Sequence, residues 1–214
     1  DEHCTVAEEY RGRFENLPPE CSHLYMAIEG KLAAVICIHD PLREEVAGVI
    51  AELKELGIKK VVMMTGDSER TARDIAKKAG GDEYYSEVLP EDKARFVEVE
   101  KAAGSKVVMI GDGINDSPAL SAADVGVAIS DGAEIAREIA DVTIAADDLR
   151  ELVVLKKLSN SLMERIQKNY KSIVGINGSL ILLGVLGVIQ PTTSALMHNA
   201  STLAISLKSM NDLL

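Results

Sequence analysis

The sequence predicts an α/β protein in which a doubly wound parallel sheet is followed by a long helix and a hydrophobic pair of helices. Two continuous apolar runs, "KKVVMMTGD" at 59–67 and "SKVVMIGDG" at 105–113, are typical of strands buried on both faces of a parallel sheet. Segments with helical periodicity lie between and beside these runs, and several of them end at a glycine. From residue 172 to residue 207 the chain carries no Asp, Glu, Lys or Arg. These observations together predict the fold class.

The composition indicates a folded protein that does not bind nucleic acid. Of 214 residues, 47% are hydrophobic, which is enough for a sizeable core. The net charge of −11 argues against binding to duplex nucleic acid, and an aromatic content of 3% offers few surfaces for base stacking. Cys4, Cys21 and Cys37 lack metal-binding spacing and are expected to be reduced thiols in the cytoplasm.

The elements of the predicted sheet occupy the first part of the chain. "HLYMAIEGKLAAVICI" at 23–38 predicts a hairpin of two strands at a sheet edge. A helix at about 41–56, ended by Gly57, precedes the first buried strand, and helices at 68–80 and 90–104 lie between the two buried strands.

Two more short strands are expected after the second buried strand, from "DVGVAI" at 124–129 and "DVTI" at 141–144. A helix near 133–139 lies between them. The sheet ends there, because a long basic helical pattern occupies 149–171.

The uncharged stretch at 172–207 is long enough for two helices of roughly 17 to 20 residues, the length that crosses a hydrocarbon core. A turn at Gln190-Pro191 would separate them. We therefore expect a transmembrane hairpin, and the flanking basic residues place both of its ends on the cytoplasmic side. A buried helical pair of a soluble protein is the alternative, because 191–202 contains several polar residues.

Four polar patches follow predicted strands or begin predicted helices: Asp40 in "HDPLRE", Thr65-Gly66-Asp67, Lys93 in "PEDK", and "MIGDGINDSPAL" at 109–120. The carboxyl ends of adjacent parallel strands meet at one edge of a sheet, so we expect these patches to lie together.

The first of these patches to suggest phosphate chemistry is Thr65-Gly66-Asp67, where a strand ends and a helix begins. Such a turn offers backbone N–H groups, a hydroxyl and a helix N-terminus to a phosphoryl oxygen. Lys93 lies in the first turn of a helix, where the helix dipole disfavours a cation. A phosphate-facing ammonium would explain this position, and a solvated surface lysine is the alternative.

The "MIGDGINDSPAL" stretch suggests a magnesium site. Gly111 and Gly113 allow a sharp turn that leaves Asp112 at its tip. Mg²⁺ prefers a few hard oxygen ligands, so Asp112 and Asp116 suit it, and Asn115 can hydrogen-bond a phosphoryl oxygen. In the alternative, Asp116 only caps the following helix and the glycines serve a plain turn.

Taken in order, "DPLR", "MMTGD", "PEDK" and "MIGDGINDSPAL" resemble the phosphorylation-domain signatures of the heavy-metal-transporting P-type ATPases, a branch of the haloacid dehalogenase superfamily. The resemblance covers essentially the whole chain and implies a Rossmann-like, haloacid dehalogenase-like sheet. It also implies ATP-driven transport of a heavy or transition metal cation across a membrane through an aspartyl-phosphate. Mg²⁺ and ATP would be the cofactors, and the catalytic domain would lie on the cytoplasmic side of the cell membrane.

The resemblance assigns roles to individual residues. It implies that Thr65 and Lys93 contact the phosphoryl group, that Asp112 binds Mg²⁺ with Asp116 in support, and that Asn115 orients the phosphate. The catalytic set is Thr65, Gly66, Asp67, Lys93 and Asn115, and the cofactor-binding set is Asp40, Arg43, Thr65, Gly66 and Lys93.

The same resemblance divides the chain into four parts. Residues 1–38 would be the end of a nucleotide-binding domain, 39–148 most of the phosphorylation domain, 149–171 a connecting amphipathic helix, and 172–214 the last two transmembrane helices.

One departure from the family concerns the nucleophile. The family carries its reactive aspartate in an Asp-Lys-Thr-Gly motif, and none occurs in these 214 residues. We therefore expect this chain to supply the magnesium and phosphate half of the site, with the upstream domains of the same pump as partners. One alternative is a separate or truncated fragment with a binding or regulatory role. The other is a standalone phosphatase. That class needs an Asp-x-Asp motif, whereas the residue two positions after Asp40 is Leu42.

Polar residues in the predicted membrane helices suggest an ion site. His198, Ser201 and Thr202 share one helical face, Asn199 lies beside it, and Asn177 is the most interior polar residue of the preceding helix. Their position resembles that of ion ligands in the last helix of heavy-metal pumps, with His198 in place of the methionine of copper pumps. Imidazole and oxygen ligands favour Zn²⁺, Co²⁺, Mn²⁺ or Fe²⁺ over Cu⁺. In the alternative, His198 and Asn199 only satisfy the backbone near the turn.

Overall fold

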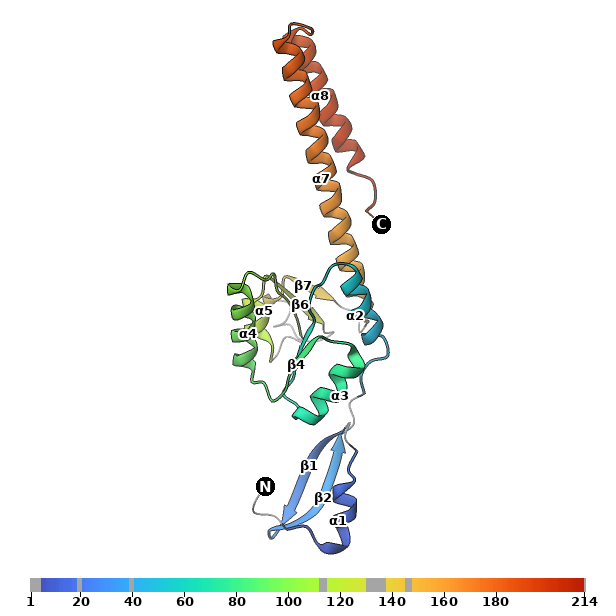
Figure 1. The fold of residues 1–214 in the computed structure, drawn as a ribbon, viewed down its shortest axis with the longest axis vertical. Helices are drawn as coiled ribbons and strands as arrows, with labels where there is room; N and C mark the ends of the chain where they lie inside the picture. The colour runs from blue at the N-terminus through green and yellow to red at the C-terminus, as the bar shows by residue number, and fades with distance from the viewer. Residues whose placement is uncertain are drawn as a thin grey trace. The chain divides into compact units, whose positions relative to one another are not determined.

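The computed structural model describes residues 5–18, 21–38, 41–111, 115–129, 138–144 and 148–213. The chain divides into two compact units, Asp1–Glu151 and Leu152–Leu214. Its elements, labelled as in Figure 1, are α1 (Glu8–Glu15), β1 (Ser22–Ile28), β2 (Lys31–Ile38), α2 (Val46–Glu55), β3 (Val62–Met64), α3 (Glu69–Ala79), β4 (Glu83–Tyr85), α4 (Pro90–Ala102), β5 (Val108–Gly111), α5 (Ser117–Ala122), β6 (Val125–Ile129), β7 (Val142–Ile144), α7 (Arg150–Val185) and α8 (Pro191–Lys208).

The first unit has the predicted α/β fold, with parallel strands alternating with helices. Strands β3 to β7 form two parallel sheets, β3-β4 and β5-β6-β7, and β1 and β2 lie apart from both. The prediction that the strands before Thr65 and Asp112 are adjacent is therefore wrong, since β3 and β5 are edge strands of different sheets. The short strand β4 was missed, because its three residues, Glu-Tyr-Tyr, carry no apolar run. The helix expected near 133–139 lies mostly outside the described residues.

The predicted hairpin is confirmed as β1 and β2, which pair antiparallel. Its turn residues Glu29 and Gly30 have φ of 50° and 76°, the left-handed pair that a tight hairpin turn requires. The hairpin was expected at a sheet edge, but it does not extend either parallel sheet. In the described ranges β1 and β2 form a two-stranded sheet of their own, to which Thr5 adds a single bridge at Lys31.

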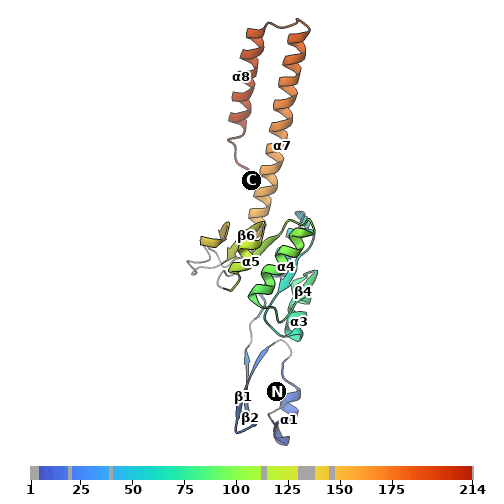
Figure 2. The same cartoon turned by 90° about the vertical axis from the view of Figure 1, so that its left-hand side faces the viewer.

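A small apolar core holds α4, β5 and α5 together. Val97, Met109, Ala119 and Leu120 are buried in one cluster, and Met64 at the end of β3 packs against it. Figures 1 and 2 both show α4 and α5 side by side. Because Met64 comes from the other parallel sheet, this cluster connects the two sheets.

Strand β6 passes close beneath α5 at Gly126. A Cβ atom at this position would lie 2.8 Å from the carbonyl oxygen of Leu120. Real Cβ contacts are longer than this, so any side chain would push α5 away from β6.

The second unit is a pair of antiparallel helices, seen side by side in Figures 1 and 2. Helix α7 runs without a break for 36 residues, across the predicted boundary at 171/172. At its middle, Arg165 donates hydrogen bonds to the carbonyls that follow α8: to Ser209 at 3.1 Å, to Asp212 at 2.5 Å, and to Asn211. The Arg165 cation lies at the C-terminal end of α8, where it also complements the dipole of that helix. Part of the basic character that predicted a membrane boundary thus serves to close the helical pair.

The prediction of two membrane-spanning helices is not supported. In the described part of the chain, no helix has both the length and the apolar character that crossing a membrane requires. The physical reason is composition. The first two-thirds of α7 are rich in charged residues, and Thr, Ser, His and Asn interrupt the apolar residues of α8.

Glu69, the first residue of α3, is the acceptor of a surface hydrogen-bond cluster. Its carboxylate accepts from Ser86 Oγ at 2.7 Å, from Arg73 Nη2 at 2.9 Å and from the Tyr84 hydroxyl at 2.9 Å. These three bonds favour the charged form and lower the pKa of Glu69 from 4.5 to about 2.

Replacing Gly126 with alanine is expected to destabilise the first unit by about 1–3 kcal/mol, the usual effect of an added methyl group in a close-packed position. The measurement is the urea midpoint of unfolding. Gly48→Ala in α2 is the matched control, because a Cβ there meets no atom within 4 Å. Equal midpoints for Gly126→Ala and the wild type would contradict the close contact.

Acid is expected to remove the stabilisation that Glu69 provides. Its folded pKa of about 2 lies below the ordinary value of 4.5, so the stabilisation is complete above pH 4.5 and is lost as the pH falls toward 2. Glu69→Gln should therefore flatten the fall in unfolding midpoint between pH 6 and pH 3, measured by circular dichroism. Glu98→Gln on the exposed face of α4 is the control. A wild-type pH profile in Glu69→Gln would show that the cluster contributes nothing.

Candidate functional site

The turn Thr65-Gly66-Asp67 follows β3 and leads into α3. The Thr65 N–H donates to the carbonyl of Tyr85 at 3.0 Å, and the N–H of Val88 donates to the carbonyl of Thr65 at 3.0 Å. The Thr65 hydroxyl donates to Asp67 Oδ2 at 2.7 Å and accepts from the Asp67 N–H at 3.1 Å. The segment after β4 thus holds the turn from one side, and Asp67 orients the Thr65 hydroxyl.

Lys93 and Asp116, which are 23 residues apart in sequence, form a close ion pair. Lys93 Nζ lies 2.7 Å from Asp116 Oδ1, and their side chains are only 15% and 13% exposed. Lys93 is in the first turn of α4, where the helix dipole disfavours a cation, and the carboxylate offsets that effect. Asp116 occupies the N-cap position of α5 but makes no side-chain capping bond. Its carboxylate forms the ion pair with Lys93 instead.

Gly111, the last residue of β5, allows Asp116 to take this position. A Cβ atom on Gly111 would lie 2.4 Å from Asp116 Oδ2 and 2.8 Å from its Cβ. The sequence suggested only that this glycine serves a sharp turn. Its close contact with Asp116 depends on how α5 returns over β5, which the sequence pattern does not reveal.

The other predicted site residues are placed as follows. Asp40, Asp112 and Gly113 lie outside the described residues. Asn115 is exposed in the bend before α5, and Arg43 is exposed before α2. Among the residues that the structure describes, no cluster of three or more His, Cys, Asp or Glu side chains could hold a metal ion.

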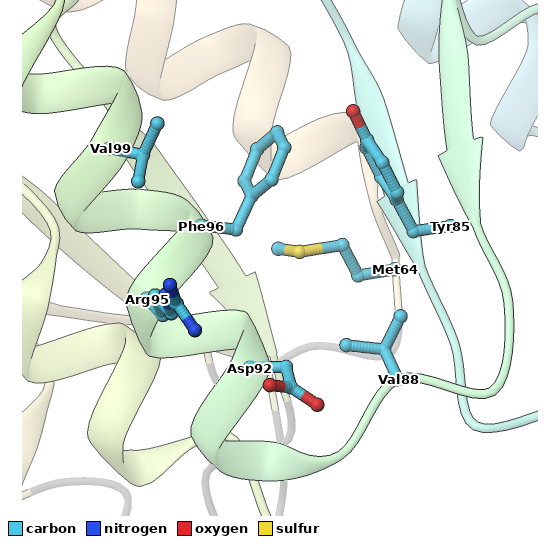
Figure 3. Close-up of a pocket in the computed structure, with 7 residues that line it drawn as sticks. All are labelled: Met64, Tyr85, Val88, Asp92, Arg95, Phe96 and Val99. Atoms are coloured by element: carbon cyan, nitrogen blue, oxygen red, sulfur yellow. The ribbon is translucent and has the colours of Figure 1, made fainter.

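Within the described residues of the first unit there are at least two pockets, and neither of these two is lined by Lys93 or Asp116. An apolar pocket of about 290 Å³ is lined by Met64, Tyr85, Val88, Asp92, Arg95, Phe96 and Val99 (Figure 3). The rings of Tyr85 and Phe96 are 4.9 Å apart within it. A second pocket of about 320 Å³ is lined in part by Gly66 and Asp67. The second pocket therefore includes two of the predicted site residues, whereas the Lys93–Asp116 ion pair lines neither pocket.

In the second unit the structure brings together two of the residues predicted to bind an ion. His198 Nδ1 in α8 lies 2.7 Å from Asn177 Oδ1 in α7. The hydroxyls of Ser201 and Thr202 both donate to the carbonyl of His198, at 2.8 and 3.0 Å. Asn199 is exposed beside them.

Known proteins match both the sequence and the fold of this chain. Residues 4–124 match the haloacid dehalogenase-like hydrolase family. The zinc-exporting P-type ATPase of Mycobacterium marinum is 39% identical over 85% of this chain and 25% of its own length. The manganese-exporting P-type ATPase of Mycobacterium tuberculosis (strain ATCC 25618 / H37Rv) is 40% identical over 85% of this chain and 26% of its own length.

A solved zinc-transporting PIB-type ATPase in its E2.Pi state matches 94% of this chain with a TM-score of 0.79 and 30% identity. The match takes in 33% of that structure, and the chain spans about a quarter of the length of the curated relatives. The chain belongs to the haloacid dehalogenase-like hydrolases and is homologous to the metal-transporting P-type ATPases.

Proposed function

We propose that this chain is the phosphate- and magnesium-organising part of an ATP-driven transition-metal pump, together with helices that contribute to its ion path. The observation that carries the proposal is the ion pair of Lys93 and Asp116 at the end of β5, where both side chains are largely shielded from solvent. The chain spans only a quarter of the length of its curated relatives, so the complete reaction is proposed for a longer protein.

The residues of the site fit phosphoryl transfer. The Lys93 ammonium neutralises charge on a transferring phosphoryl group. The Thr65 hydroxyl would donate to one of the phosphoryl oxygens in place of Asp67, its acceptor in the structure. Asp112 and Asp116 would hold Mg²⁺, because carboxylate oxygens are the hard ligands that this ion takes. When bound, Mg²⁺ neutralises and orients the phosphate oxygens. Because Asp116 Oδ1 also pairs with Lys93, the lysine and the metal ligand position one another.

The nucleophilic aspartate is proposed to come from a segment outside these 214 residues, which contain no Asp-Lys-Thr-Gly. Two observations support this. In the described ranges β3 and β5 are both edge strands, and both contribute to one core through Met64 and Met109. The apolar pocket of Figure 3 is lined in part by Met64, the last residue of β3. An added strand of the pump would pair with such an edge and bring its aspartate to the phosphate groups.

The longer pump is proposed to lie in a membrane with the first unit on the cytoplasmic side. The match to the solved zinc-transporting ATPase covers 94% of the chain, so it includes part of the second unit, which supports a place for these helices in such a pump. His198, with oxygen donors from Ser201, Thr202 or Asn199, would take part in binding Zn²⁺, Mn²⁺, Co²⁺ or Fe²⁺. The relatives include zinc and manganese exporters and also copper transporters, so the proposed ion class rests on His198 and its oxygen neighbours in α8.

A chimeric pump tests this function. The chain would replace the matching quarter of the Mycobacterium tuberculosis manganese-exporting ATPase, and membranes would be incubated with radiolabelled ATP, Mg²⁺ and Mn²⁺. We expect a phosphoprotein that hydroxylamine cleaves, as an acyl phosphate is cleaved. Lys93→Met should lower its rate of formation by about 10²–10³-fold, the effect of losing one preorganised electrostatic contact.

Lys78→Met, at the exposed end of α3, is the matched control and should label like the parent chimera. The 214-residue chain alone should not become labelled. Labelling of the chain alone, or full labelling of the Lys93→Met chimera, would contradict the proposed division of the site.

A further inference from the structure

The bond between His198 and Asn177 determines which ring nitrogen of His198 carries hydrogen. An amide oxygen only accepts hydrogen bonds, so a bond of 2.7 Å from Asn177 Oδ1 requires the N–H to be on Nδ1. A neutral imidazole has a single N–H, and Nε2 then keeps its lone pair. Within the described ranges no hydrogen-bond partner is found for Nε2, and the side chain is exposed.

We propose that Asn177 is a positioning residue, which fixes the Nδ1–H tautomer of His198 so that Nε2 coordinates a divalent transition-metal cation. This rests on the proposed function and deepens it. It differs from the expectation that Asn177 is itself a ligand, because its amide oxygen already accepts from the ring. A hydrogen bond to the far nitrogen also fixes the orientation of a metal-binding imidazole and raises its basicity.

The surroundings of this pair favour the arrangement. The hydroxyls of Ser201 and Thr202 use their hydrogens on the His198 carbonyl, so their oxygen lone pairs remain available one turn further along α8. Gly175 and Gly178 flank Asn177 in α7, and a Cβ at either glycine would meet no atom within 4 Å. His198 itself is exposed, so a cation can reach it from solvent.

The orientation of the Asn177 amide determines which ring nitrogen of His198 carries the hydrogen. If its amide nitrogen faced the ring, it would donate to Nδ1, and His198 would carry its hydrogen on Nε2. That tautomer has no lone pair on Nε2 and does not coordinate a cation there. The two arrangements are distinguishable by the nitrogen chemical shifts of the ring.

The test uses the 214-residue chain labelled with ¹⁵N in its histidine rings, at pH 8, where an ordinary imidazole is neutral. Loss of one signal set in His198→Gln assigns His198 among the four histidines. We expect a protonated-type shift for Nδ1 and a lone-pair-type shift for Nε2, and added Zn²⁺ should move Nε2. A protonated Nε2 would overturn the role of Asn177. A correct tautomer whose Nε2 ignores Zn²⁺ would instead overturn the ion-binding part of the proposed function.

Three variants isolate the contribution of Asn177. Asn177→Leu removes the acceptor, so we expect mixed tautomers and Zn²⁺ affinity about 10–100-fold lower, the usual cost of losing such a supporting bond. Asn177→Asp keeps an oxygen acceptor and should restore the Nδ1–H tautomer. Gly178→Ala is the control and should leave both readouts unchanged, with helix content checked by circular dichroism. Wild-type tautomer and affinity in Asn177→Leu would overturn the proposal.

Discussion

The packing of α4 and α5 against β5 is the constraint on which the first unit depends. Val97, Met109 and Leu120 come from three consecutive elements and share one buried cluster, which Met64 extends to the other parallel sheet. Once these apolar side chains are buried, the N-termini of α4 and α5 are fixed close together. The polar chemistry of the unit therefore rests on a small hydrophobic core that contains no catalytic group itself.

Lys93 and Asp116 show how that core serves the site. Two charges with little exposure interact more strongly than charges in water, but removing them from water is costly, so such a pair is weak evidence for a stabilising role. The close contact of Asp116 with Gly111, where no side chain fits, means that the geometry of the pair depends on this glycine. A preorganised ammonium beside a carboxylate, close to a strand end, suits a substrate that is itself an anion bound to a cation.

The sequence was sufficient for the positions of β3 and β5, the hairpin, most helices and the parallel α/β fold, because apolar periodicity and glycine stops are local signals. The prediction that β3 and β5 are buried on both faces is wrong, since Val108 and Ile110 of β5 are 49% and 39% exposed and β3 is only half-buried. The sequence also singled out Lys93 and Asp116 before their contact was visible. Prediction from the sequence failed where tertiary contacts determine the structure. Strand β4 has no apolar run, the hairpin pairs only with itself among the described elements, and the helices of the second unit are less apolar than their uncharged length suggested. The Asn177–His198 bond joins helices whose relative rotation no sequence pattern specifies.

The edge strands β3 and β5 have a practical consequence for anyone who handles this chain by itself. In the described part of the molecule, β3 and β5 each have a strand neighbour on one side only, so backbone N–H and C=O groups on the other side can pair with another molecule. Such edges promote self-association, which rises with concentration. Their shortness, three and four residues, limits this tendency. Dilute solutions, or a short peptide that pairs with the edges, are therefore the conditions under which the isolated chain stays monomeric.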